Sequence, residues 1–433
     1  VLGFGKEGKD NYLALRKLFP KKIIAIADKL EFKELSKKNQ ELLKKDKKIK
    51  LYLGKNYLQS LKNYQLIIKT PGIKPSSLKQ FLRKKIRVVS QTEIFFEYCP
   101  GKIIGVTGTK GKGTTSSLIY QILKKDGFKV HLIGNIGKPV FQTLLRAKTN
   151  DIFVYEISSH QLQTLKKSPH VAVFLNLYPD HLDYYKNFKE YCLAKESIAC
   201  YQTKKDYFIY NSEQKLLREI AKKSKAKKIP FNFKERKKLE KIISRKEIPL
   251  KGNFNLLNIL AAVLVAEIFN VSSKNIKKGI KSFKPLAHRL EFVRKYKEIE
   301  FYNDSFATIP QATIVAMDAL GKKVKTLILG GSSKGKIDFS LLAKKILKNK
   351  IENLILFPYT GKNIWKEVLN FKKRNQDLPK SFFVSSMAEA VKTAYKCTKK
   401  RSICLLSPAS ASFSIFRNYK ERGNLFKKNV RSL

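Results

Sequence analysis

The chain has 433 residues, 43% of them hydrophobic, which is enough for several domains with apolar cores and excludes global disorder. Its 90 Lys and Arg residues against 34 Asp and Glu give a formal net charge of +56. The basic residues are spread along the whole chain in pairs and triplets, such as Lys44-Lys45 and Lys277-Lys278. This pattern favours lysine-rich solvated surfaces over a dedicated nucleic-acid interface, and its positive field would favour a substrate rich in phosphate.

Cysteine usage and hydropathy indicate a cytoplasmic protein without a membrane span. The five cysteines are odd in number and lack C-x-x-C spacing, and the five histidines form no zinc motif. There is no signal peptide, and no apolar run approaches the ~18–20 residues that a membrane span needs. The chain begins at Val1, close to a glycine loop, so we expect an N-terminal truncation within a strand.

The first motif is Gly3-Phe4-Gly5-Lys6-Glu7-Gly8, which follows the short apolar start of the chain. A predicted helix over 11–18 and a predicted strand over 23–27 come next, and that strand ends at Asp28. An acidic residue about 20 positions after the last glycine is typical of a dinucleotide-binding loop. Residues 1–96 are therefore expected to form a Rossmann-like domain whose loops hold a nucleotide diphosphate.

The central motif is Gly105-Val-Thr-Gly-Thr-Lys-Gly-Lys-Gly-Thr-Thr115, between an apolar strand and a helical pattern over 116–124. A glycine-rich turn at a helix N-terminus lets backbone N–H groups converge on an anion. Lys112 adds a charge that can reach terminal phosphates. Gly113 stands where the standard motif has a hydroxyl residue as a Mg²⁺ ligand.

Further strands are predicted over 130–133, 152–155 and 171–175, as in a parallel sheet buried on both faces. Because ligands gather at the carboxyl ends of such strands, the polar residues that follow them should converge on the phosphate loop. They lie in Gly134-Asn135-Ile136-Gly137, Glu156-Ile-Ser-Ser159 and Asn176-Leu-Tyr-Pro-Asp-His-Leu-Asp183, which contain Asn135, Glu156 and His181. We expect this central P-loop ATPase-type domain to span residues 97–285.

Residues 286–433 are expected to form a third α/β domain, Rossmann-like, with strands over 299–302, 326–329, 354–357 and 402–406. Polar loops again follow the strands, at Asn303-Asp-Ser305, Gly330-Gly-Ser-Ser-Lys334 and Ser407-Pro-Ala-Ser-Ala-Ser412. The predicted fold class is α/β, with three α/β domains in series.

Taken one at a time, the candidate residues differ in how strongly they indicate a role in metal or phosphate binding. Glu156, directly after a strand, can hold Mg²⁺ that bridges nucleotide phosphates. For His181 two interpretations stay open, a metal ligand and a loop histidine without a role in binding. Lys195 lies in a predicted helix and, taken alone, reads as a surface lysine. Arg289 and Asp304 begin the third domain, where a guanidinium can reach phosphates.

Together these residues resemble the ATP-dependent Mur ligases over essentially the whole chain. The motifs that carry the resemblance are Gly105-Val-Thr-Gly-Thr-Lys-Gly-Lys112, Glu156-Ile-Ser-Ser159, Asp180-His-Leu-Asp183, Ala194-Lys195, His288-Arg289 and Asn303-Asp-Ser305. Leu406-Ser-Pro-Ala-Ser-Ala-Ser-Phe413 and Phe416-Arg-Asn-Tyr-Lys-Glu-Arg-Gly423 look like the branch that adds D-glutamate.

The resemblance implies a cytoplasmic ligase of peptidoglycan precursor synthesis that joins D-glutamate to UDP-N-acetylmuramoyl-L-alanine. ATP would activate the substrate carboxylate as an acyl phosphate, with Mg²⁺ as the metal. The partners implied are these small molecules alone, and a monomer is expected.

The resemblance also implies the role of each site residue. Catalytic roles fall to Lys112, Glu156, His181, Lys195 and Arg289. The ATP site comprises Gly108, Thr109, Lys110, Gly111, Lys112, Gly113, Thr114, Asn255, Asn258, Arg289 and Asp304. The UDP-substrate site comprises Gly3, Gly5, Gly8, Asp28, Thr70, Asn135 and Ser159. D-Glutamate would lie among Thr308, Lys334, Ser412 and Tyr419. The metal ligands would be Thr114, Glu156, His181 and a carbamylated Lys195.

Three positions depart from the family pattern. Gly113 removes one hydroxyl ligand, and Phe254 replaces the histidine of Gly-x-His-Asn. Phe306 stands where the Asp-Ser-Lys-Ala-Thr pattern has a lysine, so one expected positive charge is absent.

Three alternatives stay open at this stage. Another Mur-type ligase or a folylpolyglutamate-type ligase would share the phosphate loop. An NAD-dependent dehydrogenase would use the first glycine loop and Asp28, but would leave Lys112 and Glu156 without a role. A basic nucleic-acid-binding P-loop NTPase would use the net charge and bind DNA or RNA with steep salt dependence.

Overall fold

The structure, a computed structural model, describes residues 1–83, 85–333, 335, 337–413 and 415–433. The chain divides into two compact units, one of residues 1–247 and 256–283 and one of residues 248–255 and 284–433. Each unit has parallel sheets and its own apolar cores, which confirms the α/β class. The finer division at residues 96 and 285 stays a prediction.

The N-terminal part of the first unit is a small parallel sheet centred on Leu2. Leu2 bridges Ala27 on one side and Lys69 on the other, so the start of the chain is a central strand, as expected. The flanking strands pair in parallel as β1 with β2 and β3 with β4. Their bounds are β1 Ile24–Asp28, β2 Ile49–Leu53, β3 Leu66–Lys69 and β4 Arg87–Ser90. The helices here are α1 Lys6–Leu18, α2 Lys37–Lys44 and α3 Gln91–Tyr98.

The larger sheet of this unit has six parallel strands in the order β10-β9-β8-β5-β7-β6. Every residue of β7 and β8 is buried, as predicted for a sheet covered on both faces. The strands β9 and β10 were not predicted. On β10, exposed lysines break the apolar run at this edge, whereas β9 is an apolar run that the pattern could have found. The bounds are β5 Lys102–Thr107, β6 Val130–Gly134, β7 Ile152–Glu156, β8 Val171–Phe174, β9 Tyr207–Asn211 and β10 Lys227–Phe231.

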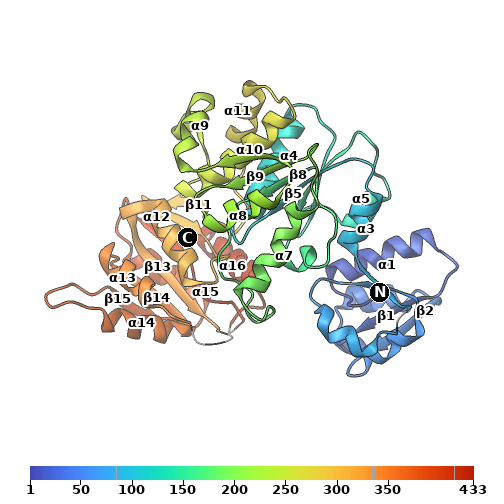
Figure 1. Cartoon of the computed structure of the whole chain (residues 1–433). Helices are drawn as coiled ribbons and strands as arrows, with labels where there is room; N and C mark the ends of the chain where they lie inside the picture. The colour runs from blue at the N-terminus through green and yellow to red at the C-terminus, as the bar shows by residue number, and fades with distance from the viewer. Residues whose placement is uncertain (84, 334, 336, 414) are drawn as a thin grey trace. The chain divides into compact units, whose positions relative to one another are not determined.

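The chain order reverses between β5 and β8, which lie side by side in the sheet (Figure 1). The loops after these two strands therefore open at the carboxyl edge where α/β sheets bind ligands. The helices of this part are α4 Lys112–Lys125, α5 Val140–Leu144, α6 Ser159–Leu162, α7 Phe188–Cys200, α8 Lys215–Lys223, α9 Arg236–Ile242, α10 Asn253–Ile268 and α11 Ser273–Lys281. In α10, residues 259–266 are all buried, as expected of a helix that is apolar on every side.

The second unit is built on a six-stranded sheet in the order β11-β12-β16-β13-β14-β15. Only the β11–β12 pair is antiparallel. The loops after the three adjacent strands β12, β16 and β13 are the three polar loops noted in the sequence. The bounds are β11 Glu291–Tyr296, β12 Ile299–Asn303, β13 Val324–Gly331, β14 Asn353–Tyr359, β15 Lys380–Phe383 and β16 Ile403–Leu406. The helices are α12 Pro310–Leu320, α13 Ser340–Lys348, α14 Thr360–Asn370, α15 Met387–Cys397 and α16 Tyr419–Arg431.

Within the first unit, one buried carboxylate links the small sheet to the larger one. Asp10 on α1 is 5% exposed. Its Oδ2 accepts hydrogen bonds from the Phe141 backbone N–H at 2.8 Å and from Gln91 Nε2 at 2.8 Å. Its Oδ1 accepts from the Gln142 N–H at 3.4 Å. In the part of the chain that the structure describes, no helix is long and apolar enough to cross a membrane.

We predict that Asp10→Ala destabilises this unit, because it leaves the buried Phe141 N–H and one hydrogen bond of the buried Gln91 amide without their acceptor. Each such loss costs about 1–3 kcal/mol, so thermal unfolding should begin several degrees lower. Calorimetry would measure this. Asp338→Ala is the control, since Asp338 caps only the exposed Ser340 N–H. Equal unfolding temperatures for the two variants would contradict the prediction.

Candidate active site

The phosphate loop joins β5 to α4, and its conformation requires glycine at two positions. Gly108 and Gly111 have φ angles of 152° and 87°, which residues with a Cβ rarely adopt. Gly111 caps α4, and a Cβ there would also collide with the Asn258 side chain from α10. Helix α4 therefore begins immediately after the loop, and the Asn258 side chain lies against Gly111 at this junction.

The loop is braced by the segment that follows β8. Asn176 pairs with Lys110 twice, accepting from its N–H at 2.8 Å and donating to its carbonyl at 3.0 Å. The Thr109 hydroxyl donates to the Tyr178 carbonyl at 3.1 Å, and Tyr191 OH lies 3.1 Å from it. The strand-end rule placed Asn176, two residues after β8, in a segment expected at the phosphate loop, but sequence reasoning gave it no role and did not name Tyr191.

Lys112 is the first residue of α4, and its side chain folds back over the loop. Its Nζ donates to the Gly108 carbonyl at 2.8 Å and to the Thr109 carbonyl at 3.0 Å. The charge of Lys112 therefore lies at the phosphate loop. Thr114 is two residues further along α4, and consecutive helix positions do not face each other. Its hydroxyl thus points differently from one placed at residue 113.

Lys195 is not a surface lysine, so the interpretation of this residue taken alone was wrong. It is 1% exposed on α7, and its Nζ donates to the Thr107 hydroxyl at 3.1 Å and to the Gly108 carbonyl at 3.0 Å. Burial, and then the charge of Lys112, lower the pKa of Lys195 well below its usual range, although nearby carboxylates oppose this. The structure thus places a lysine with a lowered pKa, which gives up its proton more readily than an exposed lysine, directly under the phosphate loop.

Three polar strand-end residues lie around this amine. Glu156 is the last residue of β7 and 5% exposed, and its carbonyl accepts from the Asn135 N–H at 3.3 Å. The charges of Asp180 and Glu156 act on Lys195, and Asp180 forms a 3.3 Å ion pair with Lys110. The backbone of Asp180 leads directly into His181, which has a left-handed φ of 56°.

The histidine at this edge has a lowered pKa, which favours its neutral form. Burial lowers the pKa of His181, and the charges of Lys112 and Lys195 lower it further, while Asp180 opposes them. Its ring packs edge-on to that of His160 at 4.9 Å. A neutral imidazole can offer a nitrogen lone pair to a metal. Among the residues described, no group of three or more His, Cys, Asp or Glu side chains could hold a metal by itself.

The first glycine loop is also closely packed. Gly3 has a φ of 87°, and a Cβ there would collide with Thr70, as one at Gly8 would with the Gly3 carbonyl. Asp28 is buried and accepts from the Phe4 N–H at 2.5 Å and the Leu30 N–H at 2.9 Å, so it holds the loop. Around Gly5, the N-cap of α1, the space is open.

Two other residues predicted for the UDP substrate lie at the edge of the larger sheet in the same unit. Asn135 is exposed after β6, whereas Ser159 is 2% exposed at the start of α6. Their assignment to the substrate stays a prediction.

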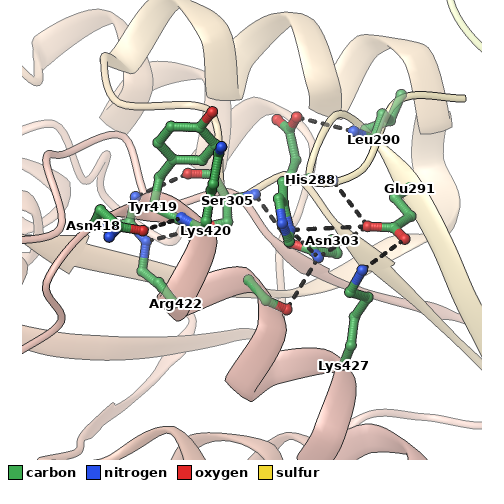
Figure 2. Close-up of polar contacts among 12 residues, drawn as sticks. His288, Leu290, Glu291, Asn303, Ser305, Asn418, Tyr419, Lys420, Arg422 and Lys427 are labelled. Atoms are coloured by element: carbon green, nitrogen blue, oxygen red, sulfur yellow. Dashed lines mark hydrogen bonds and ion pairs between the residues drawn. The ribbon is translucent and has the colours of Figure 1, made fainter. Parts of the chain in front are cut away.

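In the second unit, a buried polar network surrounds Asn303 at the end of β12 (Figure 2). Asn303 Nδ2 lies 3.0 Å from His288 Nδ1 and 3.2 Å from Glu291 Oε2. Glu291 also accepts from the His288 N–H at 2.9 Å and from Lys427 Nζ at 3.1 Å. Burial lowers the pKa of His288, and because the amide nitrogen of Asn303 can only donate, His288 Nδ1 is the acceptor in their contact. This network fixes the turn that carries Arg289.

Arg422 on α16, which Figure 2 shows near Ser305, is fully buried and joins two of the polar loops. It donates to the Ser305 hydroxyl at 3.0 Å and carbonyl at 2.9 Å, and to the carbonyls of Ser410 at 3.2 Å and Ala411 at 3.3 Å. Burial lowers its pKa to about 9. Sequence reasoning gave it no role, because among so many basic residues nothing marks it as buried.

The other site residues predicted in this unit lie at the following places. Ser412 is buried, and Tyr419 begins α16, its carbonyl accepting from the Ser305 hydroxyl at 2.8 Å. Thr308 is partly exposed in the segment before α12. Asn255 belongs to this unit and donates to the Lys251 carbonyl at 2.7 Å. Lys334 lies outside the described residues.

Asp304 follows Asn303 and is held by two neighbours. Its Oδ1 accepts from the Leu290 N–H at 3.0 Å, and its Oδ2 accepts from the Ser407 hydroxyl at 2.9 Å. Burial raises the pKa of Asp304 to about 7, against opposing effects of these hydrogen bonds and of Arg289.

Comparison with known proteins agrees with this geometry. A family model of the Mur ligase middle domain matches residues 106–266, which include the phosphate loop, Glu156, His181 and Lys195. The UDP-N-acetylmuramoylalanine–D-glutamate ligase of Clostridium kluyveri is 35% identical over 450 residues, covering 100% of this chain and 96% of the relative. That of Acetivibrio thermocellus is 37% identical over 408 residues, covering 89% and 86%. The chain belongs to the Mur ligase family.

Solved Mur ligase structures share the fold at low sequence identity. The UDP-N-acetylmuramate–alanine ligase MurC from Thermotoga maritima has a TM-score of 0.61 at 16% identity and covers 100% of this chain and 98% of its own. MurF from the same organism, in complex with ADP, has a TM-score of 0.60 at 15% identity and covers 100% and 94%. The three-domain α/β architecture of a Mur ligase is therefore the fold of this chain.

We predict that Asp304 makes stability fall as pH rises. A carboxyl with a pKa of about 7 in the folded state and an ordinary value of 3.8 retains its proton longer when folded, so its stabilising effect is present at low pH and lost as pH rises to about 7. Asp304→Asn cannot ionise. Unfolding measured at about pH 5 and about pH 8 should show the variant gaining stability relative to the wild type as pH rises. A constant difference would refute the assignment.

Proposed function

We propose that this Mur ligase joins D-glutamate to UDP-N-acetylmuramoyl-L-alanine at the expense of ATP. The observation that carries the proposal is the neutral-favouring amine of Lys195 beneath a phosphate loop, at hydrogen-bond distance from Gly108. The relatives at 35–37% identity over most of the chain support the choice of branch.

The residues of the phosphate loop suit binding of the terminal phosphates of ATP. The backbone N–H groups at the start of α4 provide an anion site, which the helix dipole strengthens. Lys112 already bridges Gly108 and Thr109, and a phosphate oxygen can replace these carbonyl acceptors. The two hydrogen bonds between Asn176 and Lys110 would hold the loop backbone in place while Lys112 changes its acceptors.

We assign Lys195 as a site of carbamylation. A neutral amine can attack carbon dioxide, whereas an ammonium cannot, and burial together with Lys112 favours the neutral form. Bond formation between Nζ and the carbon of carbon dioxide, with loss of one amine proton, gives a carbamate anion. That anion would lie beside the charge of Lys112, which lowers the cost of burying it.

The donor set also fits Mg²⁺. Glu156, His181 and the carbamate would hold it, with water and substrate phosphates completing the shell, since Mg²⁺ is usually bound by few protein carboxylates. When bound, it would neutralise phosphate charge during transfer. Thr114 is assigned as a further ligand, in place of the hydroxyl that Gly113 lacks.

The reaction proposed is two displacements in sequence. The carboxylate of UDP-N-acetylmuramoyl-L-alanine attacks the terminal phosphorus of ATP, and ADP leaves. The amine of D-glutamate then attacks the acyl carbon, loses a proton and displaces phosphate. Lys112 and the helix N-terminus stabilise charge during phosphoryl transfer. The glycine loop with Asp28 and Thr70 would hold the UDP end, and the loops with Thr308, Ser412, Tyr419 and Lys334 would hold D-glutamate.

The alternative functions differ in which of the site residues they would leave without a role. A dehydrogenase would need only the first glycine loop, and the buried Lys195 would have no role. Another Mur-type or folylpolyglutamate-type ligase would share the ATP site, and the choice between them depends on substrate. We assign the protein to the cytoplasm as a monomer, without a nucleic-acid partner.

The decisive assay is phosphate release with ATP and UDP-N-acetylmuramoyl-L-alanine, comparing D-glutamate with L-lysine. We expect release to depend on D-glutamate. Gly113→Ser restores a hydroxyl next to Lys112, so it should lower the Mg²⁺ concentration needed for half-maximal rate. Lack of stimulation by D-glutamate in both proteins would reject this branch.

Carbamylation can be tested without activity. In the presence of ¹³C-labelled bicarbonate, the wild type should give a carbamate resonance that Lys195→Met lacks. Lys223→Met is a matched control, because Lys223 is exposed and its pKa is raised by Glu196. A resonance that survives in Lys195→Met would place the modification elsewhere.

A further inference from the structure

Phe306 forms a direct contact with Arg289. The centre of the Arg289 guanidinium lies 4.1 Å from the centroid of the Phe306 ring. A guanidinium over an aromatic face is attracted by the negative potential of that face, an effect that grows as water is excluded. Phe306 is 38% exposed, so the ring is not simply a core residue.

The Phe306 ring is itself held in place. It packs edge to face with the Tyr419 ring, with 4.9 Å between the ring centroids and an angle of 87° between the ring planes. Tyr419 in turn lies edge-on to His288 at 6.1 Å. The Phe306 N–H donates to the His288 carbonyl at 3.0 Å. This hydrogen bond joins the backbone at Phe306 to the backbone just before Arg289.

The turn that carries Arg289 is rigid for independent reasons. His288 and Leu290 have left-handed φ angles of 65° and 48°, which non-glycine residues adopt only where surrounding contacts impose them. Here Glu291 and Asp304 accept hydrogen bonds from the His288 and Leu290 N–H groups, at 2.9 Å and 3.0 Å. With the backbone fixed, the direction of the guanidinium depends on its side-chain contacts, and Phe306 is one of them.

We propose that Phe306 is a positioning residue, which holds the Arg289 guanidinium in the direction that this site requires. Where the family pattern has a lysine, this chain thus has an aromatic face that orients the neighbouring cation. A lysine at position 306 would place a second positive charge close to Arg289 and repel it. That Arg289 then contacts nucleotide phosphate rests on the proposed function.

The contact itself can be tested by NMR without any assay of activity. With ¹⁵N-labelled arginine, the Arg289 Nε–H signal, assigned by its loss in Arg289→Lys, should show the ring-current shift of a proton near an aromatic face. Phe306→Tyr should keep this shift, and Phe306→Leu should abolish it. An unchanged signal in Phe306→Leu overturns the proposal, whether or not the chain is a ligase.

The consequence for the reaction is tested with the same variants. We expect Phe306→Leu and Phe306→Lys to lower kcat/KM for ATP by about tenfold, with the KM for the UDP substrate unchanged. Phe306→Tyr should retain activity. Unfolding temperatures should stay close to that of the wild type, because the side chain is 38% exposed. A purely structural role would lower the unfolding temperature instead and would overturn the proposal.

Phe306→Lys restores the residue of the family pattern, so its outcome discriminates most sharply. If it raises kcat/KM above the wild type, the missing lysine charge matters more than the ring, and the proposal is wrong. Tyr296→Leu is the matched control, since it removes the ring under another arginine of this unit, Arg294, at 4.8 Å. It should leave kcat/KM unchanged. Absence of D-glutamate-dependent turnover in the wild type would reject the proposed function alone, and the NMR result would still decide the contact.

Discussion

The site depends first on a lysine that is buried where a charge is costly. Lys195 places its amine within hydrogen-bond distance of Thr107 and Gly108, at the end of β5, while Lys112 approaches the same Gly108 carbonyl. Two ammonium ions sharing one acceptor in a buried place repel each other, and the more deeply buried one gives up its proton more easily. The chemistry of this edge therefore follows from packing, because α7 brings the Lys195 amine to the start of the phosphate loop.

The surrounding structure fixes this arrangement from several directions. Asn176 holds Lys110 through two hydrogen bonds, and Tyr191, one turn before Lys195 on α7, contacts Thr109. Asn258 packs against Gly111, where a Cβ would collide with its side chain and where φ is 87°. Each contact comes from a different element, so the loop is preorganised before any ligand binds. Preorganised dipoles of this kind lower the reorganisation needed during charge transfer.

Much of the fold could be predicted from the sequence, because buried parallel strands appear as apolar runs with polar residues after them. This rule found β7 with Glu156 and β12 with Asn303. It failed for β10, where lysines point to solvent on an edge strand, and for β11, an edge strand that pairs antiparallel and is only partly buried. An edge strand needs little apolar surface, so its sequence resembles a loop. The interior strand β9 was also not predicted, although its sequence is an apolar run.

The site was harder to predict, because burial and tertiary contact are not visible in residue type. Lys195 and Arg422 are two of 90 basic residues, and only the structure separates them from the solvated majority. The family resemblance identified Lys195 but gave Arg422 no role. The fully buried guanidinium of Arg422 donates to the Ser305 hydroxyl and to backbone carbonyls, and these acceptors belong to the loops after β12 and β16. Arg422 thus orders the backbone of two loops at once. The same logic applies at Phe306, where a departure from the family pattern becomes intelligible only beside the cation that it faces.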